Sequence, residues 1–187
     1  NETDATNPQS VYGKTKRDGE VAIRAAGGRH LIFRTSWVHA ARGGNFIRTV
    51  LRLARQRDAL SMVADQVGAP TGAELIADVT ARAVQAIAAG EVSADTASGT
   101  YHLTASGETD WHRYAQLVVR EARRRGYQLQ LDSEAVRPIT TAEYPLPAAR
   151  PANSRLDTQK LRNTFGLVLP DWQRGVERTV AELVEAG

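Results

Sequence analysis

The chain of 187 residues carries a formal net charge of +3, and it is long enough for one main domain with an appended lobe. Hydrophobic residues make up 42% of it and charged residues 24%, which is ordinary for a globular protein and argues against disorder, collagen and coiled coil. Because the chain has no cysteine, disulfides, a thiolate nucleophile and cysteine-bound metals are excluded.

The placement of charged and apolar residues limits the partners that we expect. The basic excess is scattered arginine, without the interleaved exposed aromatics that favour nucleic acid. No apolar run reaches the roughly 20 residues that span a bilayer, and the four histidines lack metal-ligand spacing. We therefore expect no nucleic acid, no membrane and no metal, and a cytoplasmic location. A homodimer through the arginine-rich surface helices is compatible with the sequence.

The first third of the chain alternates helix and strand signals. Small and apolar residues at helical spacing predict a helix over 14–26, ended by a pair of glycines. A short β-rich run over 30–38 predicts a buried strand, and an amphipathic pattern over 45–58 predicts the next helix. Another short strand is expected over 59–65. This alternation favours an α/β fold with a mostly parallel sheet.

The rest of the chain continues the alternation of helices and strands, interrupted after residue 126 by a proline-rich stretch with little periodicity. In chain order we expect a Gly/Pro-rich loop over 66–74, a helix over 73–89 and a strand over 99–106. A helix over 111–125, capped by Thr109 or Asp110, comes next, and a proline-rich surface stretch with short strands at most follows over 127–157. Two helices end the chain, the first capped by Asp157 and the second opened by Pro170 and Asp171.

One short segment, "NPQSVYGKTKRDGE" at 7–20, places a tyrosine and a lysine four residues apart. Four residues make just over one helical turn, so Tyr12 and Lys16 project from the same face and can share one ligand. An ammonium beside a tyrosine stabilises the phenolate and makes the phenol a better proton donor near neutral pH. Taken alone, the pattern Y-x-x-x-K also fits two solvated residues on an ordinary surface helix.

The surrounding segments narrow that choice. "NPQSVYGKTKRDGE", "FRTSWV", "GGNFIRTVLRLA", "DQVGAPTGAELIAD", "GTYHLTASGETDWHRYA" and "RPANSRLDTQKL" follow one another in this order and cover most of the chain. Together they resemble the dTDP-4-dehydrorhamnose reductases of the extended short-chain dehydrogenase/reductase superfamily. The resemblance implies the C-terminal portion of a Rossmann-like parallel sheet with a small α+β substrate-binding lobe. It divides the chain into 1–103, with 59–72 on the substrate side, and 104–187.

The resemblance also implies roles for three residues. Tyr12 would be the catalytic acid that protonates the C4 ketone oxygen of a dTDP-sugar while NADPH, or NADH, delivers hydride to C4. Lys16 would bind the nicotinamide ribose and stabilise the phenolate of Tyr12, so that both residues also contact the cofactor. Trp37 would lie against the substrate sugar, although a tryptophan at a strand end also serves in a core.

Other residues of the matching segments have a structural explanation of equal weight. Thr35 and Ser36 would line the nicotinamide pocket or cap a strand, and Asn45 would face the substrate or cap a helix. The remaining candidates are Phe46, which begins that helix, the turn residues Asp65, Gln66, Gly68, Pro70 and Thr71, and Arg150, a candidate for reaching a diphosphate.

The departures from the family pattern matter as much. The glycine-rich strand-turn-helix that grips a dinucleotide pyrophosphate is not found in the sequence, and the Ser/Thr partner of the tyrosine would lie upstream of Asn1. His39 stands where relatives tend to have another aromatic residue. Since Met62 is the only methionine, we expect a piece of a longer or processed chain, with little reductase activity and weak NADPH binding when isolated.

Two alternatives to a reductase remain at this level. A nucleotide-sugar epimerase or dehydratase of the same superfamily shares Y-x-x-x-K, although "RTSWV" and "NFIRTVLRLA" favour the reductase. A non-catalytic regulatory subunit of reductase-like fold would also lack the glycine-rich turn, but it would not need Tyr12 and Lys16. Activity of the full-length gene product separates these alternatives.

Overall fold

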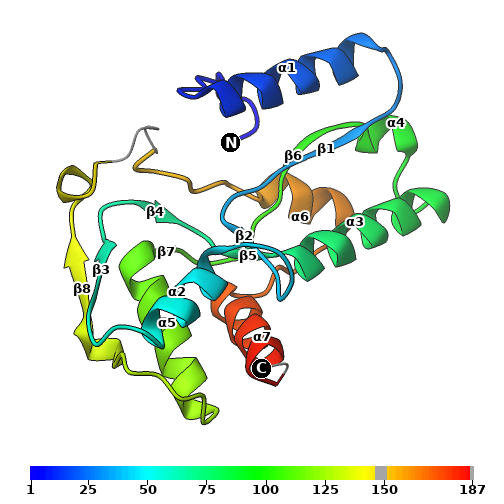
Figure 1. Cartoon of the computed structure of the whole chain (residues 1–187). Helices are drawn as coiled ribbons and strands as arrows, with labels where there is room; N and C mark the ends of the chain where they lie inside the picture. Colours follow the sequence, from blue (N-terminus) through cyan, green and yellow to red (C-terminus); the bar gives the residue numbers. More distant parts are fainter. Residues whose placement is uncertain (146–150, 186–187) are drawn as a thin grey trace.

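The computed structural model describes residues 1–145 and 151–185, and Figure 1 shows the course of the chain. The helices are α1 (Val11–Ala25), α2 (Phe46–Ala54), α3 (Ala73–Ala88), α4 (Ala94–Ala97), α5 (Trp111–Arg124), α6 (Gln159–Phe165) and α7 (Trp172–Glu185), with 3₁₀ turns at η1 (Ser133–Ala135) and η2 (Thr141–Glu143). The strands are β1 (Leu31–Arg34), β2 (Val38–His39), β3 (Leu60–Val63), β4 (Val67–Gly68), β5 (Thr71–Gly72), β6 (Gly99–His102), β7 (Thr109–Asp110) and β8 (Val136–Ile139). None of the described helices is long and apolar enough to cross a membrane.

The strands form short pairs. β1 pairs with β6, β2 with β5 and β3 with β8, all in parallel, whereas β4 and β7 are antiparallel. The prediction of an α/β fold with mostly parallel pairing is confirmed, but the described strands make four two-stranded sheets and not one continuous sheet. Pairs of this size are marginal by themselves, so the helices packed around them must supply most of the stability.

The strand expected over 30–38 is split in two. β1 ends at Arg34 and β2 begins at Val38, because Trp37 between them has φ of 49° and leaves the extended conformation. The expectation of a buried strand holds only for Ile32, because its neighbours in β1 are half-buried.

Two further predictions need correction. The segment 66–74, expected to be a loop, contains the short strands β4 and β5, whose partners lie far away in the sequence. The N-cap position of α6 is Thr158, without a side-chain cap bond, whereas Asp157 accepts a hydrogen bond from the Gln159 backbone N–H at 2.8 Å. Asp157 was expected at the N-cap position, but it lies one residue before the N-cap and still binds the first turn of the helix. The expected cap of α5 is confirmed as Asp110, which accepts from the Arg113 N–H.

The buried side chains form two clusters. The larger cluster joins α2, α5 and α7, and it includes the fully buried Val50, Val118 and Val176. The second cluster joins α3, β6 and α6 around Tyr101 and Leu161. Each cluster is built from helices distant in sequence, so the clusters hold the two halves of the chain together.

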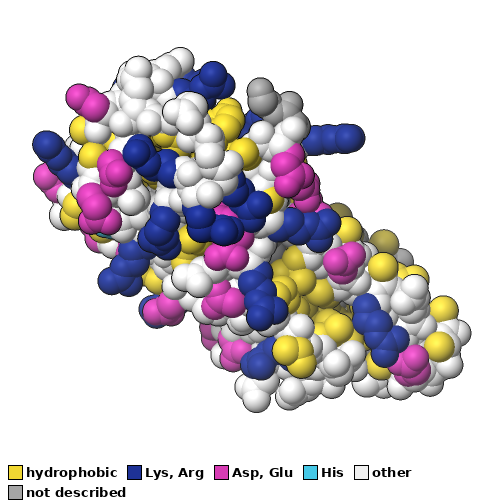
Figure 2. Space-filling view, turned by 90° about the horizontal axis from the view of Figure 1, so that it is seen from below, with side chains coloured by type: hydrophobic (Ala, Val, Ile, Leu, Met, Phe, Trp, Pro, Cys, Tyr) yellow, Lys and Arg dark blue, Asp and Glu magenta, His cyan; other side chains and the backbone are white. Residues whose placement is uncertain are grey.

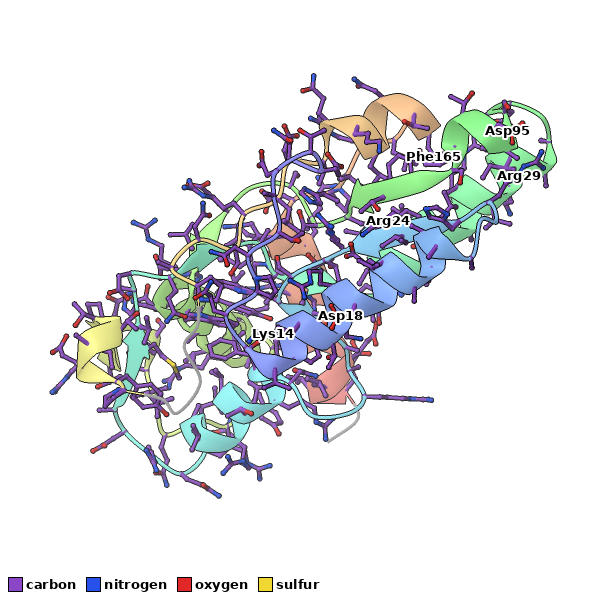
Figure 3. All side chains as sticks on the ribbon, turned by 90° about the horizontal axis from the view of Figure 1, so that it is seen from above. Lys14, Asp18, Arg24, Arg29, Asp95 and Phe165 are labelled. Atoms are coloured by element: carbon purple, nitrogen blue, oxygen red, sulfur yellow. The ribbon has the colours of Figure 1, made fainter. Side chains whose placement is uncertain are left out.

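The first helix lies outside both clusters. No residue of α1 is buried, and Val11, Val21 and Ile23 are 78%, 52% and 47% exposed. Figure 1 shows α1 at the top of the molecule, above the β1/β6 pair, and Figure 3 shows it from above with Lys14, Asp18 and Arg24 spaced along it. Among the described elements, β6 is the only strand that pairs with β1, so an exposed helix lies above a strand paired on one edge.

Candidate functional site

The helix that carries Tyr12 and Lys16 begins at Val11, three residues before the start that the sequence predicted at Lys14. Ser10 is the N-cap, and its hydroxyl accepts a hydrogen bond from the Gly13 N–H at 3.1 Å. A Cβ at Gly13 would come 3.0 Å from Cβ of Pro8. The absence of a side chain at Gly13 therefore lets the segment before the helix pack closely against its first turn. Tyr12 and Lys16 therefore occupy the first turns of a well-defined helix.

Tyr12 and Lys16 lie together as the four-residue spacing predicts. The Lys16 Nζ is 5.4 Å from the centroid of the Tyr12 ring, a distance at which a cation is attracted to the ring. Tyr12 is 71% exposed, so this pair faces solvent and can be reached by a ligand. The geometry allows the phenol to donate a proton while the ammonium stabilises the resulting negative charge.

An ion pair connects this helix to the strand below it. The Arg34 guanidinium donates to both Glu20 oxygens, at 2.8 Å from Nε and 2.6 Å from Nη2. Arg24 adds a third contact to Glu20 at 3.3 Å. These hydrogen bonds, that from Arg34 first, lower the pKa of the Glu20 carboxyl. Because α1 buries no side chain, the two-pronged Glu20–Arg34 contact is the best-defined bond between α1 and β1.

Trp37 is held by contacts with distant parts of the chain. Its ring stacks on Trp111 with a centroid separation of 3.8 Å and an interplanar angle of 20°. It also lies so close to Gly68 that a Cβ there would come 2.7 Å from the Trp37 ring. The Trp111 indole N–H donates to Gln66 at 3.1 Å. The structure thus gives Trp37 a fixed orientation, but no hydrogen bond or aromatic contact within the described residues joins it to Tyr12.

A hollow of about 880 Å³ lies beside this aromatic stack. Its walls are mostly apolar and come from α2, β3, the start of α5 and the turn η2, including Phe46, Met62, Trp111 and Tyr144. Apolar walls with a few polar groups are typical of small-molecule sites. Met62, Trp111 and Tyr144 were not singled out from the sequence, because their approach depends on contacts between segments about 50 to 80 residues apart.

The turn after β3 has a structural role. Both Asp65 carboxylate oxygens accept from the Thr141 backbone N–H, at 2.9 and 3.0 Å, and Oδ1 also accepts from the Thr141 hydroxyl at 2.7 Å. These hydrogen bonds, that from the hydroxyl first, lower the pKa of Asp65. Gln66 donates to the Thr141 hydroxyl at 3.1 Å and accepts from Trp111. The turn fixes one wall of the hollow beside Trp111.

Some of the other candidate residues make structural contacts, and for the rest the described part of the chain shows no contact that explains a role. Asn45 is the N-cap of α2, accepting from the Arg48 N–H at 3.3 Å and donating to the Ala40 carbonyl at 2.6 Å. The Thr71 hydroxyl donates to the Ala69 carbonyl. Ser36 has a buried hydroxyl without a hydrogen-bond partner among the described residues. Two further candidates receive no role from the structure: Thr35, which is exposed, and Pro70. Arg150 lies outside the described residues.

His39, the departure from the family pattern, lies inside the larger cluster. It is 2% exposed, and its Nδ1 is 3.0 Å from the buried Thr179 hydroxyl. Its ring lies 6.4 Å from that of Tyr114. Burial lowers the pKa of His39 to about 4 and raises that of Tyr114. His39 is therefore a neutral core residue at physiological pH. No group of three or more metal-ligating side chains occurs in the described ranges.

Together these observations define the class of protein. A helix that opens on Tyr12 and Lys16, followed by a parallel strand that leads to Trp37, is the arrangement of a short-chain dehydrogenase/reductase-like α/β protein. The chain belongs to the RmlD substrate binding domain family, whose family model matches residues 1–185.

Named relatives agree with this assignment. The chain is 53% identical over 182 residues to the dTDP-4-dehydrorhamnose reductase of Shigella flexneri and 52% identical to that of Escherichia coli K12, covering 97% of this chain and 59% of each relative. The chain therefore spans about three-fifths of the length of these relatives.

Solved structures show the same fold. The dTDP-4-dehydrorhamnose reductase of Bacillus anthracis in complex with NADP has a TM-score of 0.79 at 32% identity, covering 97% of this chain and 58% of that one. The orthologue from Clostridium acetobutylicum has a TM-score of 0.82 at 32% identity, covering 97% and 59%. A UDP-galactose 4-epimerase with a TM-score of 0.72 at 20% identity, covering 99% and 57%, shows likeness of fold alone.

Proposed function

We propose that this chain is the substrate-binding part of a cytoplasmic dTDP-4-dehydrorhamnose reductase, which reduces the C4 ketone of dTDP-4-dehydro-L-rhamnose to dTDP-L-rhamnose. The observation that carries the proposal is the exposed Tyr12–Lys16 pair at the start of α1, in a chain about half identical to two reductases of that name. The division into a Rossmann-like part at 1–103 and a substrate lobe at 104–187 belongs to the same proposal.

The residues present fit one end of the cofactor. Tyr12 and Lys16 offer exposed donors that would hold the nicotinamide ribose. No strand-turn-helix with the glycine-rich spacing for a pyrophosphate occurs in the described part of the chain. NADPH, which fits the NADP complex of the Bacillus anthracis relative, would supply the hydride when bound. We therefore expect the isolated chain to bind it weakly.

In the proposed reaction the residues of this chain transfer a proton and orient the dTDP-sugar. The Tyr12 phenol would donate its proton to the ketone oxygen as negative charge develops there, and the Lys16 ammonium would stabilise the phenolate that forms. The hollow beside Trp37 and Trp111 has walls suited to one face of a sugar and a planar base. We propose that the dTDP-sugar binds there, with its ketone directed toward Tyr12.

A complementation experiment tests the proposal. The 187-residue chain would be mixed with the part of the Shigella flexneri reductase that it does not match, and loss of NADPH absorbance would be followed with dTDP-4-dehydro-L-rhamnose. We expect turnover only in the mixture, and Tyr12→Phe should lower it by about 10² or more, the usual contribution of a general acid. Turnover that survives Tyr12→Phe would contradict the assignment.

A binding measurement separates failure of assembly from failure of chemistry. Titration of dTDP into the chain alone, followed by tryptophan fluorescence, tests the hollow without NADPH. We expect Trp111→Leu to weaken dTDP binding, because Trp111 forms one wall. The matched control is Trp172→Phe, a tryptophan that lies in the larger core cluster and does not line the hollow.

A further inference from the structure

A second groove, of about 820 Å³, borders α2 next to the hollow proposed for the dTDP-sugar, and Thr49 lines both. It runs along α2 and is closed on its other side by Tyr127, after the end of α5, and by Leu183 near the end of α7. In Figure 1 these elements are in the lower part of the molecule, whereas α1 lies at the top. The proposed reductase chemistry uses none of the three arginines that line this groove: Arg48, Arg52 and Arg55.

The three arginines project in one direction. Arg48 and Arg52 lie on α2, and Arg55 is the C-cap residue of that helix, still in a helical conformation. Spacings of four and then three residues place the three on one face, with about 5–6 Å between neighbouring Cβ atoms. The row is about 10 Å long, at about 1.5 Å per residue. Figure 2, which views the molecule from below, shows Lys and Arg side chains, with Asp and Glu side chains among them, near the middle of that face.

These arginines lack the neutralising partners that others have. Arg82, Arg124 and Arg125 each lie within 3.0 Å of a carboxylate, at 2.6, 2.6 and 2.9 Å. Across the ranges that the structure describes, none of the three groove arginines forms an ion pair, and no Asp or Glu lines the groove. The result is a concave surface with about three positive charges and no internal counter-charge.

Two of the guanidinium groups are already held in place. Arg48 donates to the Ala41 carbonyl at 2.8 Å. Arg55 donates to the Tyr127 hydroxyl at 3.3 Å, and its guanidinium lies 5.5 Å from the centroid of that ring. Fixed side chains lose less conformational entropy when a ligand binds. Each guanidinium still has free N–H groups, because it carries five donors.

The shape and charge of the groove select a class of ligand. Guanidinium groups bind phosphate oxygens in pairs, and the start of α2 at Gly44 and Asn45, which also lines the groove, adds the positive end of a nine-residue helix. A row of about 10 Å suits several charges in a short linear ligand. We propose that this groove is a binding site for a linear oligophosphate, distinct from the neighbouring hollow that we propose for the dTDP-sugar.

The test measures binding of inorganic tripolyphosphate to the whole 187-residue chain by titration calorimetry, at about 50 mM and about 200 mM salt, since charge-driven binding weakens with salt. The variant R48Q/R52Q/R55Q should bind at least about 10-fold more weakly at low salt, a loss of about 1.4 kcal/mol. The matched control R120Q/R137Q/R174Q removes three exposed arginines outside the groove and the same net charge. It should stay within about 2-fold of the parent, because its charges are distant and screened.

Three outcomes would overturn the proposal. They are equal weakening by both triple variants, which would mean attraction to net charge alone; absence of binding at low salt; and tighter binding of hexaglutamate than of tripolyphosphate, which would assign the groove to acidic peptides. Should R48Q/R52Q/R55Q fail to fold, Arg52→Gln alone decides the question. Arg52 makes no side-chain hydrogen bond or ion pair within the described chain, so its loss should weaken tripolyphosphate binding without altering the unfolding midpoint.

Discussion

The buried His39 gives the sharpest prediction of stability. Its side chain is 2% exposed and meets Thr179 through Nδ1. Desolvation lowers its pKa from 6.5 to about 4 in the folded chain. Between these two pH values the unfolded chain binds a proton at this position and the folded chain does not. Stability is therefore complete above pH 6.5 and falls as the pH drops toward 4.

The size of the effect follows from the two pKa values. A difference of about 2.5 units corresponds to about 3.4 kcal/mol at pH values below both. At pH 5 the unfolded state is stabilised by about 2 kcal/mol relative to pH 7.5, because its imidazole is then mostly protonated. Two kcal/mol is a large share of the roughly 5–15 kcal/mol that stabilises a typical domain.

Urea denaturation of the parent and of His39→Phe at pH 7.5 and pH 5 measures this contribution. The parent should lose about 2 kcal/mol more than the variant between the two pH values, whatever the variant's stability at pH 7.5. His30→Gln, at a half-buried position outside both core clusters, is the control and should leave the pH dependence of the parent in place. Equal losses in the parent and in His39→Phe would refute the assignment of a neutral buried imidazole.

Three further substitutions test the contacts around the site. Gly68→Ala forces a Cβ to within 2.7 Å of the Trp37 ring, so it should cost about 1–3 kcal/mol and change the near-UV circular dichroism; an unchanged spectrum would count against the close contact. Glu20→Gln weakens the paired contact to Arg34 and should speed amide hydrogen exchange in α1 alone. Gly107→Ala places a side chain at φ of 79° and should lower the unfolding midpoint, at a cost of about 1 kcal/mol or more.

The long helices could be predicted from the sequence because their signals are local. The bounds of α3 and α5 agree with the expected helices to within one residue, since apolar periodicity and the cap at Asp110 act over a few residues. The adjacency of Tyr12 and Lys16 is equally local, because a four-residue spacing places two side chains together on any helix. The half of the candidate site that lies on α1 was therefore predictable.

The other half depends on contacts that no local pattern encodes. Trp37 has φ of 49°, which is uncommon for a residue other than glycine. No sequence signal near Trp37 predicts this conformation. Its neighbours Gly68 and Trp111 lie 31 and 74 residues further along the chain. The two-residue strands β4 and β5 went unpredicted for the same reason, because each exists only through its distant partner.

These distant contacts share one origin. In the antiparallel pair of β4 and β7, Gly68 lies opposite Thr109 and Val67 lies opposite Asp110. Asp110 is also the N-cap of α5, whose first residue is Trp111. One short pairing thus places Gly68 beside the Trp37 ring and Trp111 over it. Because a pair of two-residue strands is marginal by itself, the aromatic stack must stabilise the pairing that positions it. We therefore expect the strand pair and the wall of the hollow beside Trp37 and Trp111 to form, and to be lost, together.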